Sequence, residues 1–435
     1  MTADARRTDP ALATPAPVPA TAPGRLPGGS RRWMWLAAWP VVAALALSNE
    51  PAPLYVLWQG RFGFSAATIT LIYAAYIAGL LVTLTFAGTL ADRYGRKPVL
   101  LPGLALSLVA SVLFATAQSV AVLGVARLLT GFAVGAVLAA GMAAVADLAP
   151  PGQKQFGGLV ASASMVGGAA LGPMLAGVLS ETLPHPTTLV FVVQAGLLLV
   201  AVAVVLRMPL ARPGEPPAVR SGGADAEPGG GGVAEPGPRR ARRLVRIPSV
   251  PRPHRRTLLL GLAVLAPGMT ATGFVLSLGP SLLADLLDSD NRALAGGMIF
   301  LLFAAATGVQ FAVRTLRVRV LFTLGAALTC AAMAALVLGT ALTSVPLLLA
   351  AAVLAGLGQG SAQLGGLSTL SARIPGARLA EANAALTGGG YLMAGVLPVA
   401  AGYLSDAVGL TAGTTAFGIA VAVLVTAGAV AATRR

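Results

Sequence analysis

Glu50 and Arg127 are ionisable residues that lie inside long apolar segments of this sequence. Ionisable groups in apolar surroundings are costly and by default indicate functional sites. A carboxyl group can take up and release a proton; burial disfavours its charged form, whereas a nearby guanidinium favours it. A change that separated the two groups would therefore move a proton. The alternatives are a static ion pair, or a Glu50 near interfacial water on a helix that Pro51 and Pro53 disrupt.

The apolar segments that hold these residues are long enough to cross a lipid bilayer. Of the 435 residues, 56% are hydrophobic and 10% charged, which is outside the range of soluble domains. Runs of about 20 apolar residues cross a hydrocarbon core and must be helical, because lipid offers the backbone no hydrogen bonds. The predicted spans are residues 33–57, 66–89, 97–117, 120–146, 156–180, 187–207, 257–281, 293–314, 319–340, 345–370, 380–404 and 410–432. The sequence predicts an all-α membrane protein with twelve transmembrane helices.

These spans place Glu50 and Arg127 at similar depths. Glu50 precedes Trp58, at the end of the first span, by eight residues, and Arg127 lies seven residues into the span 120–146. At 1.5 Å per residue, both lie roughly 10 to 12 Å from the same surface. Equal depth permits the two side chains to meet.

The net charge of +15 is explained by the membrane rather than by nucleic acid. With the N-terminus in the cytoplasm, every Lys and Arg falls in a cytoplasmic segment except Arg61, Arg127 and Arg292. This is a positive-inside distribution. It predicts a multi-pass protein of the cell (cytoplasmic or inner) membrane with both termini in the cytoplasm.

The chain divides into two halves of six spans. The predicted domains are a disordered cytoplasmic tail (1–32), a first helical bundle (33–207), a cytoplasmic linker (208–256), a second bundle (257–432) and a short tail (433–435). The linker is rich in Pro and Arg and contains four consecutive glycines, which is typical of flexible segments. The four tryptophans are predicted to anchor the first span at the interfaces: Trp33, Trp35, Trp39 and Trp58.

Matching small residues recur at an offset of 225 positions. The pairs are Gly131 and Gly356, Gly135 and Gly360, Pro173 and Pro398, Gly177 and Gly402, and Ser180 and Ser405. Single matches arise by chance in a chain with 53 glycines, but several at one offset favour diverged repeats. Because each half has six spans, the repeats share one orientation.

The loop after the second span carries the most specific motif. It reads GTLADRYGRKP and contains Gly88, Asp92, Arg93, Gly95, Arg96 and Lys97. Gly88 would permit close helix approach, Gly95 a tight turn, and the basic residues hold the loop inside. This loop resembles the signature loop of the major facilitator superfamily. The resemblance implies the major facilitator fold and a conformational role for Asp92, as part of a latch between the halves. Asp147 closes the fourth span on the cytoplasmic side and is expected to join the same network; the alternative is an acid solvated at the interface. The matching loop of the second half, Arg314 to Arg319, has no Asp.

Two further motifs are similar to those of the twelve-helix drug:proton antiporter family. The fifth span contains Gly168, Gly172, Pro173 and Gly177, with Ala176 in place of one expected glycine. Small residues permit close packing and Pro173 favours a bend. Arg127, followed by Gly131 and Gly135, resembles the basic motif of the fourth helix.

The family fold implies a central cavity lined by the first, fourth, seventh and tenth helices. Candidate cavity residues are Asn49, Tyr55, Gln359, Gln363, Asn383 and Tyr391. Each of them could instead bridge two helices. A cavity with so little charge favours apolar or amphipathic compounds, although Arg127 could receive a carboxylate. His185 and His254 fall in predicted loops and provide no proton relay.

We therefore expect proton-coupled efflux of a small apolar or amphipathic compound by alternating access. The alternatives are a facilitator or importer of a small metabolite and, from another class, a membrane enzyme or sensor. The sequence contains no phosphate-binding glycine loop, metal-ligand cluster or nucleophile with a base. The expected partners are a small-molecule substrate, protons and the bilayer, without cofactor or nucleic acid, and the expected functional unit is a monomer.

Overall fold

The computed structural model describes residues 30–210, 254–287 and 291–433, and these ranges are helical with short connections. The helices are α1 (Arg31–Asn49), η1 (Ala52–Leu54), α2 (Tyr55–Phe62), α3 (Ala66–Leu84), α4 (Ala87–Tyr94), α5 (Lys97–Ala115), α6 (Val120–Asp147), α7 (Lys154–Thr182), α8 (Pro186–Arg207), α9 (Arg255–Leu287), α10 (Arg292–Ala312), α11 (Val318–Ala341), α12 (Val345–Arg373), α13 (Gly376–Val408) and α14 (Leu410–Thr433). Within the described ranges, 12 spans are long and apolar enough to cross a membrane, and α1, η1 and α2 together form the first. The all-α prediction with twelve spans is confirmed. Most of the predicted tails and of the linker lies outside the described residues.

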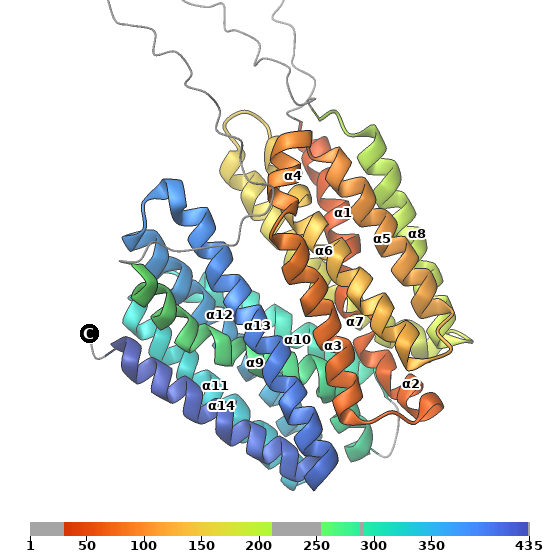
Figure 1. Cartoon of the computed structure of the whole chain (residues 1–435), viewed down its shortest axis with the longest axis vertical. Coiled ribbons are helices and arrows are strands. Elements are labelled where there is room, and N and C mark those ends of the chain that lie inside the picture. The colour runs from red at the N-terminus through yellow and green to blue at the C-terminus, as the bar shows by residue number, and fades with distance from the viewer. Residues whose placement is uncertain (1–29, 211–253, 288–290, 434–435) are drawn as a thin grey trace, which may run out of the picture.

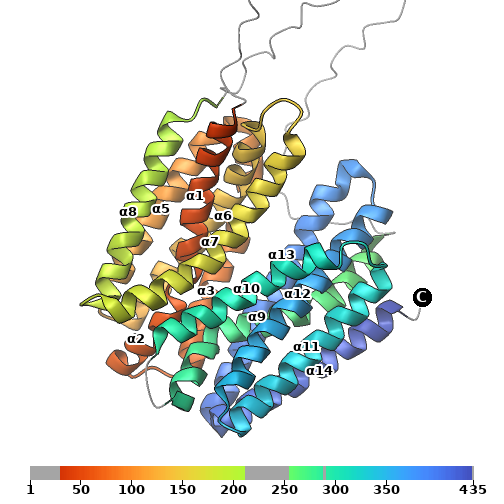
Figure 2. The ribbon, with the colours of Figure 1, turned by 180° about the vertical axis from the view of Figure 1, so that it is seen from behind.

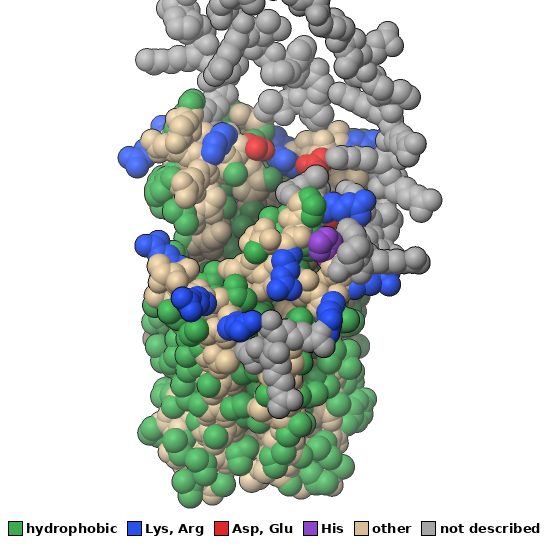
Figure 3. All heavy atoms as spheres, turned by 90° about the vertical axis from the view of Figure 1, so that its left-hand side faces the viewer, with side chains coloured by type: hydrophobic (Ala, Val, Ile, Leu, Met, Phe, Trp, Pro, Cys, Tyr) green, Lys and Arg blue, Asp and Glu red, His purple; other side chains and the backbone are tan. Residues whose placement is uncertain are grey.

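The helices form two bundles, α1 to α8 and α9 to α14. The bundles converge at the end that carries α2 and diverge toward the end that carries α4 (Figures 1 and 2). We call the α4 end the basic end, because Arg96, Lys97, Lys154 and Arg207 lie there, and we call the other the opposite end. On the face shown in Figure 3, hydrophobic side chains cover the part away from the basic end, as lipid contact requires.

Glycines at matching positions make matching contacts in the two halves. A Cβ atom at Gly131 in α6 would collide with the backbone oxygen of Tyr76 in α3, and one at Gly356 in α12 would collide with the backbone oxygen of Leu302 in α10. These glycines let the helix axes approach closely, as small residues do at membrane interfaces. The offset of 225 residues therefore corresponds to a structural equivalence between the halves.

Two details of the sequence-based spans are corrected. The second span was expected to reach residue 89, but α3 ends at Leu84, and α4 is a separate short helix. Trp58 was expected to be an interfacial anchor, but it is 1% exposed. Its ring stacks on Phe114 and Phe191, with centroids 5.9 and 6.0 Å away. Aromatic side chains bury a large apolar area, and Trp58 places it in the interior of the bundle.

Candidate functional site

Glu50 lies at a break in the first span. It follows the last residue of α1, and the chain then forms the 3-10 turn η1 before α2 begins. Pro51 has no N–H to continue the α-helical hydrogen bonds, so the helix ends here. The Glu50 side chain is 1% exposed, and its Oε2 has no hydrogen-bond partner among the described residues. A buried acid without a partner differs strongly in free energy between its protonated and charged forms.

Arg127 binds the same break from α6. Its side chain is 1% exposed and donates hydrogen bonds to the Ser48 carbonyl oxygen and to the Tyr55 hydroxyl. Its guanidinium also lies over the rings of Tyr55 and Tyr76, 5.4 and 5.8 Å from the centroids. The last carbonyls of a helix lack backbone partners and carry partial negative charge. Arg127 therefore caps the C-terminal end of α1.

Glu50 and Arg127 lie at one break, but no ion pair joins them in the described part of the chain. The partners of Arg127 are instead Ser48 and Tyr55, which flank Glu50 in the sequence. The turn η1, which follows Glu50, contacts α7 of its own bundle and α9 and α10 of the other bundle. A change in the charge of Glu50 would therefore act on a segment that lies between the two halves.

Several of the candidate cavity residues bridge helices. The Asn49 amide donates to the Ala169 carbonyl in α7 at 3.4 Å, and the Thr272 hydroxyl in α9 donates to Gln359 Oε1 in α12 at 2.6 Å. Gln363, Asn383 and Tyr391 are partly buried, and Asn383 Oδ1 is buried without a partner among the described residues. These three residues remain candidates for contact with a substrate.

Two tyrosines that sequence reasoning missed lie beside Arg127. Tyr73 and Tyr76 of α3 are 5% and 7% exposed, and their ring centroids are 6.3 Å apart. Tyr73 also faces the other half, because a Cβ atom at Gly273 in α9 would lie 3.4 Å from its ring. Their spacing of three residues puts both on one face of a helix and could have identified them. Tyr55 and Tyr76 cover the buried guanidinium, and Tyr73 extends this aromatic wall from Tyr76 toward the second half.

The signature loop forms an ion-pair network at the basic end. Arg96 lies 2.8 Å from Asp92 and 3.3 Å from Asp147, and all three belong to the first half. Gly95 adopts a φ of 94°, which agrees with the predicted tight turn. The close helix approach expected at Gly88 is not present in this conformation, because a Cβ atom there would meet nothing within 4 Å. The two bundles diverge toward this end (Figures 1 and 2), and the contacts of α4 are with α3, α5 and α6 of its own bundle.

We expect Asp92→Asn to lower the transport rate while expression and membrane insertion stay largely intact. The substitution removes one of the two carboxylates that hold Arg96, and exposed pairs contribute about 0.2 to 1 kcal/mol each. It should therefore change the balance between conformations rather than remove a span. The measurement is transport together with labelling of cysteines placed at the basic end. If both were unchanged, a conformational role for Asp92 would be excluded.

The glycine-proline motif of α7 faces two different neighbours. Cβ atoms at Gly168 and Gly172 would collide with the backbone of α1 at Val42 and Ala46. A Cβ atom at Gly177 would instead collide with the Arg292 carbonyl of α10, in the other half. The contact with the second half begins at Pro173, since a Cβ atom at Gly296 in α10 would collide with the Pro173 carbonyl oxygen, and Pro173 also removes a backbone donor. The motif therefore packs α7 on the broken helix at one point and on the second half at another.

Comparison with known proteins agrees with this architecture. The family model described as Major Facilitator Superfamily matches residues 32–340. The chain belongs to the Major Facilitator Superfamily. It is thus a secondary membrane transporter and not an enzyme, and the family predicted from the signature loop is confirmed.

Relatives within the superfamily include resistance proteins. The quinolone resistance protein NorA of Staphylococcus aureus is 29% identical over 154 residues, which are 35% of this chain and 39% of NorA. The multidrug resistance protein MdtL of Escherichia coli is 37% identical over 83 residues, 19% of this chain and 21% of MdtL. The chain therefore matches less than half of the length of these relatives.

Solved structures of the superfamily share the whole fold. A variant of the nucleoside transporter NupG superposes with a TM-score of 0.71 at 12% identity, covering 91% of this chain and 98% of NupG. A bacterial homologue of the human lysosomal transporter Spinster, in an inward-facing and unoccupied conformation, gives 0.70 at 13% identity, covering 93% and 97%. At these identities the likeness shows the fold alone.

Proposed function

We propose that this transporter exports a small apolar or amphipathic compound in exchange for protons, by alternating access. The observation that carries the proposal is the buried Glu50 carboxyl, which forms no ion pair with any residue that the structure describes and lies beside a turn that touches both halves. Proton exchange at this carboxyl changes the free energy of that turn and hence of the contact between the halves. The names of the resistance proteins and the glycine-proline motif of α7 support export over import.

In this proposal the basic end and both termini lie in the cytoplasm. Lys and Arg residues gather at the cytoplasmic side of membrane proteins. The separation of the halves at the basic end then corresponds to an inward-facing state. A compound from the cytoplasm would reach the aromatic wall of Tyr55, Tyr73 and Tyr76, whose rings offer apolar contact area. The membrane is proposed to be the cell (cytoplasmic or inner) membrane.

The test is substrate flux in proteoliposomes with an imposed pH gradient. We expect fluorescent amphipathic compounds to accumulate in vesicles that are acidic inside. If one proton is exchanged for each molecule, a gradient of one pH unit supports a concentration ratio of up to about tenfold. A protonophore should remove this accumulation, and protein-free vesicles made in the same way control for passive trapping of weak bases. Equal rate and extent of flux with and without the gradient would instead indicate a facilitator.

A further inference from the structure

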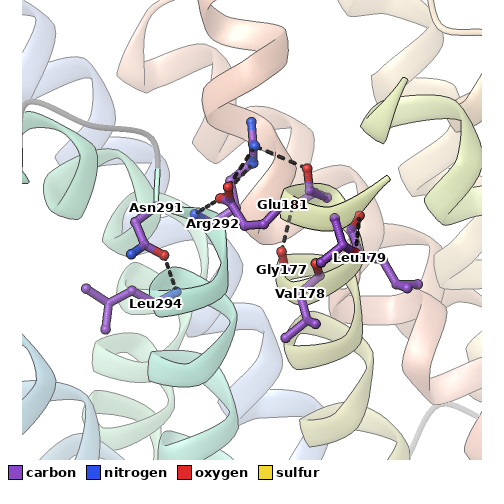
Figure 4. Close-up of polar contacts among 9 residues, drawn as sticks. Gly177, Val178, Leu179, Glu181, Asn291, Arg292 and Leu294 are labelled. Carbon is purple, nitrogen blue, oxygen red and sulfur yellow. Dashed lines mark hydrogen bonds and ion pairs between the residues drawn. The ribbon is translucent and has the colours of Figure 1, made fainter. Parts of the chain in front are cut away.

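Glu181, near the end of α7, binds the beginning of α10 in the other half. Its Oε1 accepts the backbone N–H of Arg292, the first residue of α10, at 2.8 Å. The Arg292 guanidinium donates to Glu181 Oε2 at 3.2 Å and to the Ser180 carbonyl at 3.1 Å (Figure 4). The acid of one half thus occupies the N-terminus of a helix of the other half, where negative charge is stabilised.

Asp406, near the end of α13, makes the equivalent contact in the reverse direction. Its Oδ1 accepts the backbone N–H of Ala66 at 3.0 Å, and its Oδ2 accepts that of Ala67 at 3.2 Å. Ala66 and Ala67 are the first residues of α3, in the first half. Asp406 lies 225 positions after Glu181, and Arg292 lies 225 positions after Ala67. The two contacts are therefore related by the same repeat offset as the glycines of α6 and α12.

We propose that Glu181 and Asp406 are paired, pseudo-symmetric latches that hold the opposite end closed and must both release before the transporter can open there. This inference rests on the alternating access of the proposed function, but not on its substrate or on its protons.

The geometry explains why separation of the halves must break both latches. Each acid lies on a helix of one half, and the amides that it binds belong to the other half, so neither contact survives if the bundles part at this end. Small residues bring the helices within reach: a Cβ atom at Gly177 would collide with the Arg292 carbonyl, and one at Gly402 would lie 2.8 Å from the Ala67 Cα. A neutral hydrogen bond of 3.2 Å from Ser281 to Gln59 joins the halves at the same end.

The contacts between α3 and α13 weaken with distance from the Asp406 latch. A Cβ atom at Gly395 would lie 3.3 Å from Ile77, and one at Gly388 would lie 3.8 Å from Leu81. At the basic end, the ion pairs of Arg96 are made within the first half. In this conformation the latches therefore act at the closed end of the molecule. The Glu181 side chain is 36% exposed, so water can replace its partners when the latch opens.

The experiment measures cysteine alkylation by a water-soluble maleimide in the purified full-length protein in lipid nanodiscs. Cys330→Ser removes the native thiol, and Thr70→Cys reports on opening, because Thr70 is 0% exposed beneath the Asp406 latch. We expect Glu181→Ala and Asp406→Ala each to raise the alkylation rate about fivefold, since an N-cap acid contributes about a factor of five. The double variant should show about 25-fold if the latches are independent. Thr182→Ala is the matched control and should leave the rate unchanged, because Thr182 is next to Glu181 and its hydroxyl donates to the Val178 and Leu179 carbonyls of its own helix.

A second reporter, Leu81→Cys toward the basic end, separates opening from unfolding. Opening of one end should be accompanied by closure of the other, so the alkylation of Leu81→Cys should slow in the latch variants. Unfolding would instead accelerate the alkylation of both reporter cysteines. Two results would overturn the proposal: a Thr70→Cys rate in the double variant equal to that of the Thr182→Ala control, or a double variant no faster than the faster single variant. Neither readout uses a substrate or a pH gradient, so failure of proton-coupled export would leave this test unaffected.

Discussion

Glu50→Gln should abolish substrate accumulation driven by a pH gradient while downhill exchange of the substrate survives. The amide keeps the size and much of the hydrogen bonding of the acid, but it cannot exchange a proton. Because Glu50 is buried beside the turn that contacts α7, α9 and α10, loss of its titration should uncouple the proton from the movement of the halves. Uphill accumulation and counterflow, measured in the same proteoliposome preparation, separate coupling from recognition.

Glu50→Asp is the matched control for this prediction. It retains a carboxyl group at the same backbone position, so accumulation should persist at a reduced rate, because the shorter side chain moves the acid. If Glu50→Gln kept the accumulation and proton stoichiometry of the unmodified protein, Glu50 would have a structural role. Asp147 would then be the next carrier to test.

Arg127→Met should lower transport roughly tenfold or more. The substitution keeps a long apolar side chain but removes the donors to the Ser48 carbonyl and the Tyr55 hydroxyl. Hydrogen bonds with a charged partner contribute about 1.5 to 3 kcal/mol, and a buried acceptor that loses its donor is destabilised. Arg127→Lys should be nearly as damaging, since one ammonium group cannot reproduce the two directions of the guanidinium. Initial rates of transport at equal protein density provide the measurement.

Tyr55→Phe tests whether the capping of α1 carries this effect. It removes one partner of Arg127 and leaves the Ser48 carbonyl bound, so we expect a smaller loss than in Arg127→Met. The thermal unfolding midpoint shows whether each variant is still folded. If the Arg127→Met protein were folded and transported at the rate of the unmodified protein, capping of the α1 break by Arg127 would not contribute to transport.

The twelve spans and the family could be predicted from the amino-acid sequence. The ends of α6, α8 and α11 lie within one residue of the predicted spans, because apolar runs bounded by charged or turn residues must be helical in lipid. The glycines 225 positions apart indicated diverged repeats, and the structure shows that Gly131 and Gly356 each let two helices approach closely. Glu50 and Arg127 were identified for the same reason: a charge inside an apolar run stands out.

The partners of these residues could not be predicted from the sequence. Equal depth permitted an ion pair between Glu50 and Arg127, but a depth along a helix says nothing about the direction of a side chain around it. The guanidinium points to the unpaired end of α1 and to two tyrosine rings. Trp58 likewise lies among aromatic rings that come from α5 and α8.

The latches formed by Glu181 and Asp406 could be recognised only from the tertiary structure. In the sequence they are single acids near the ends of spans, where a solvated charge is the ordinary expectation. Each meets its partner amides only because the two halves pack with a pseudo-twofold relation at the opposite end. The local sequence is enough to predict which segments cross the bilayer as helices and where small residues recur along them. Contacts between halves depend on the rotation and separation of whole bundles, which no local segment encodes.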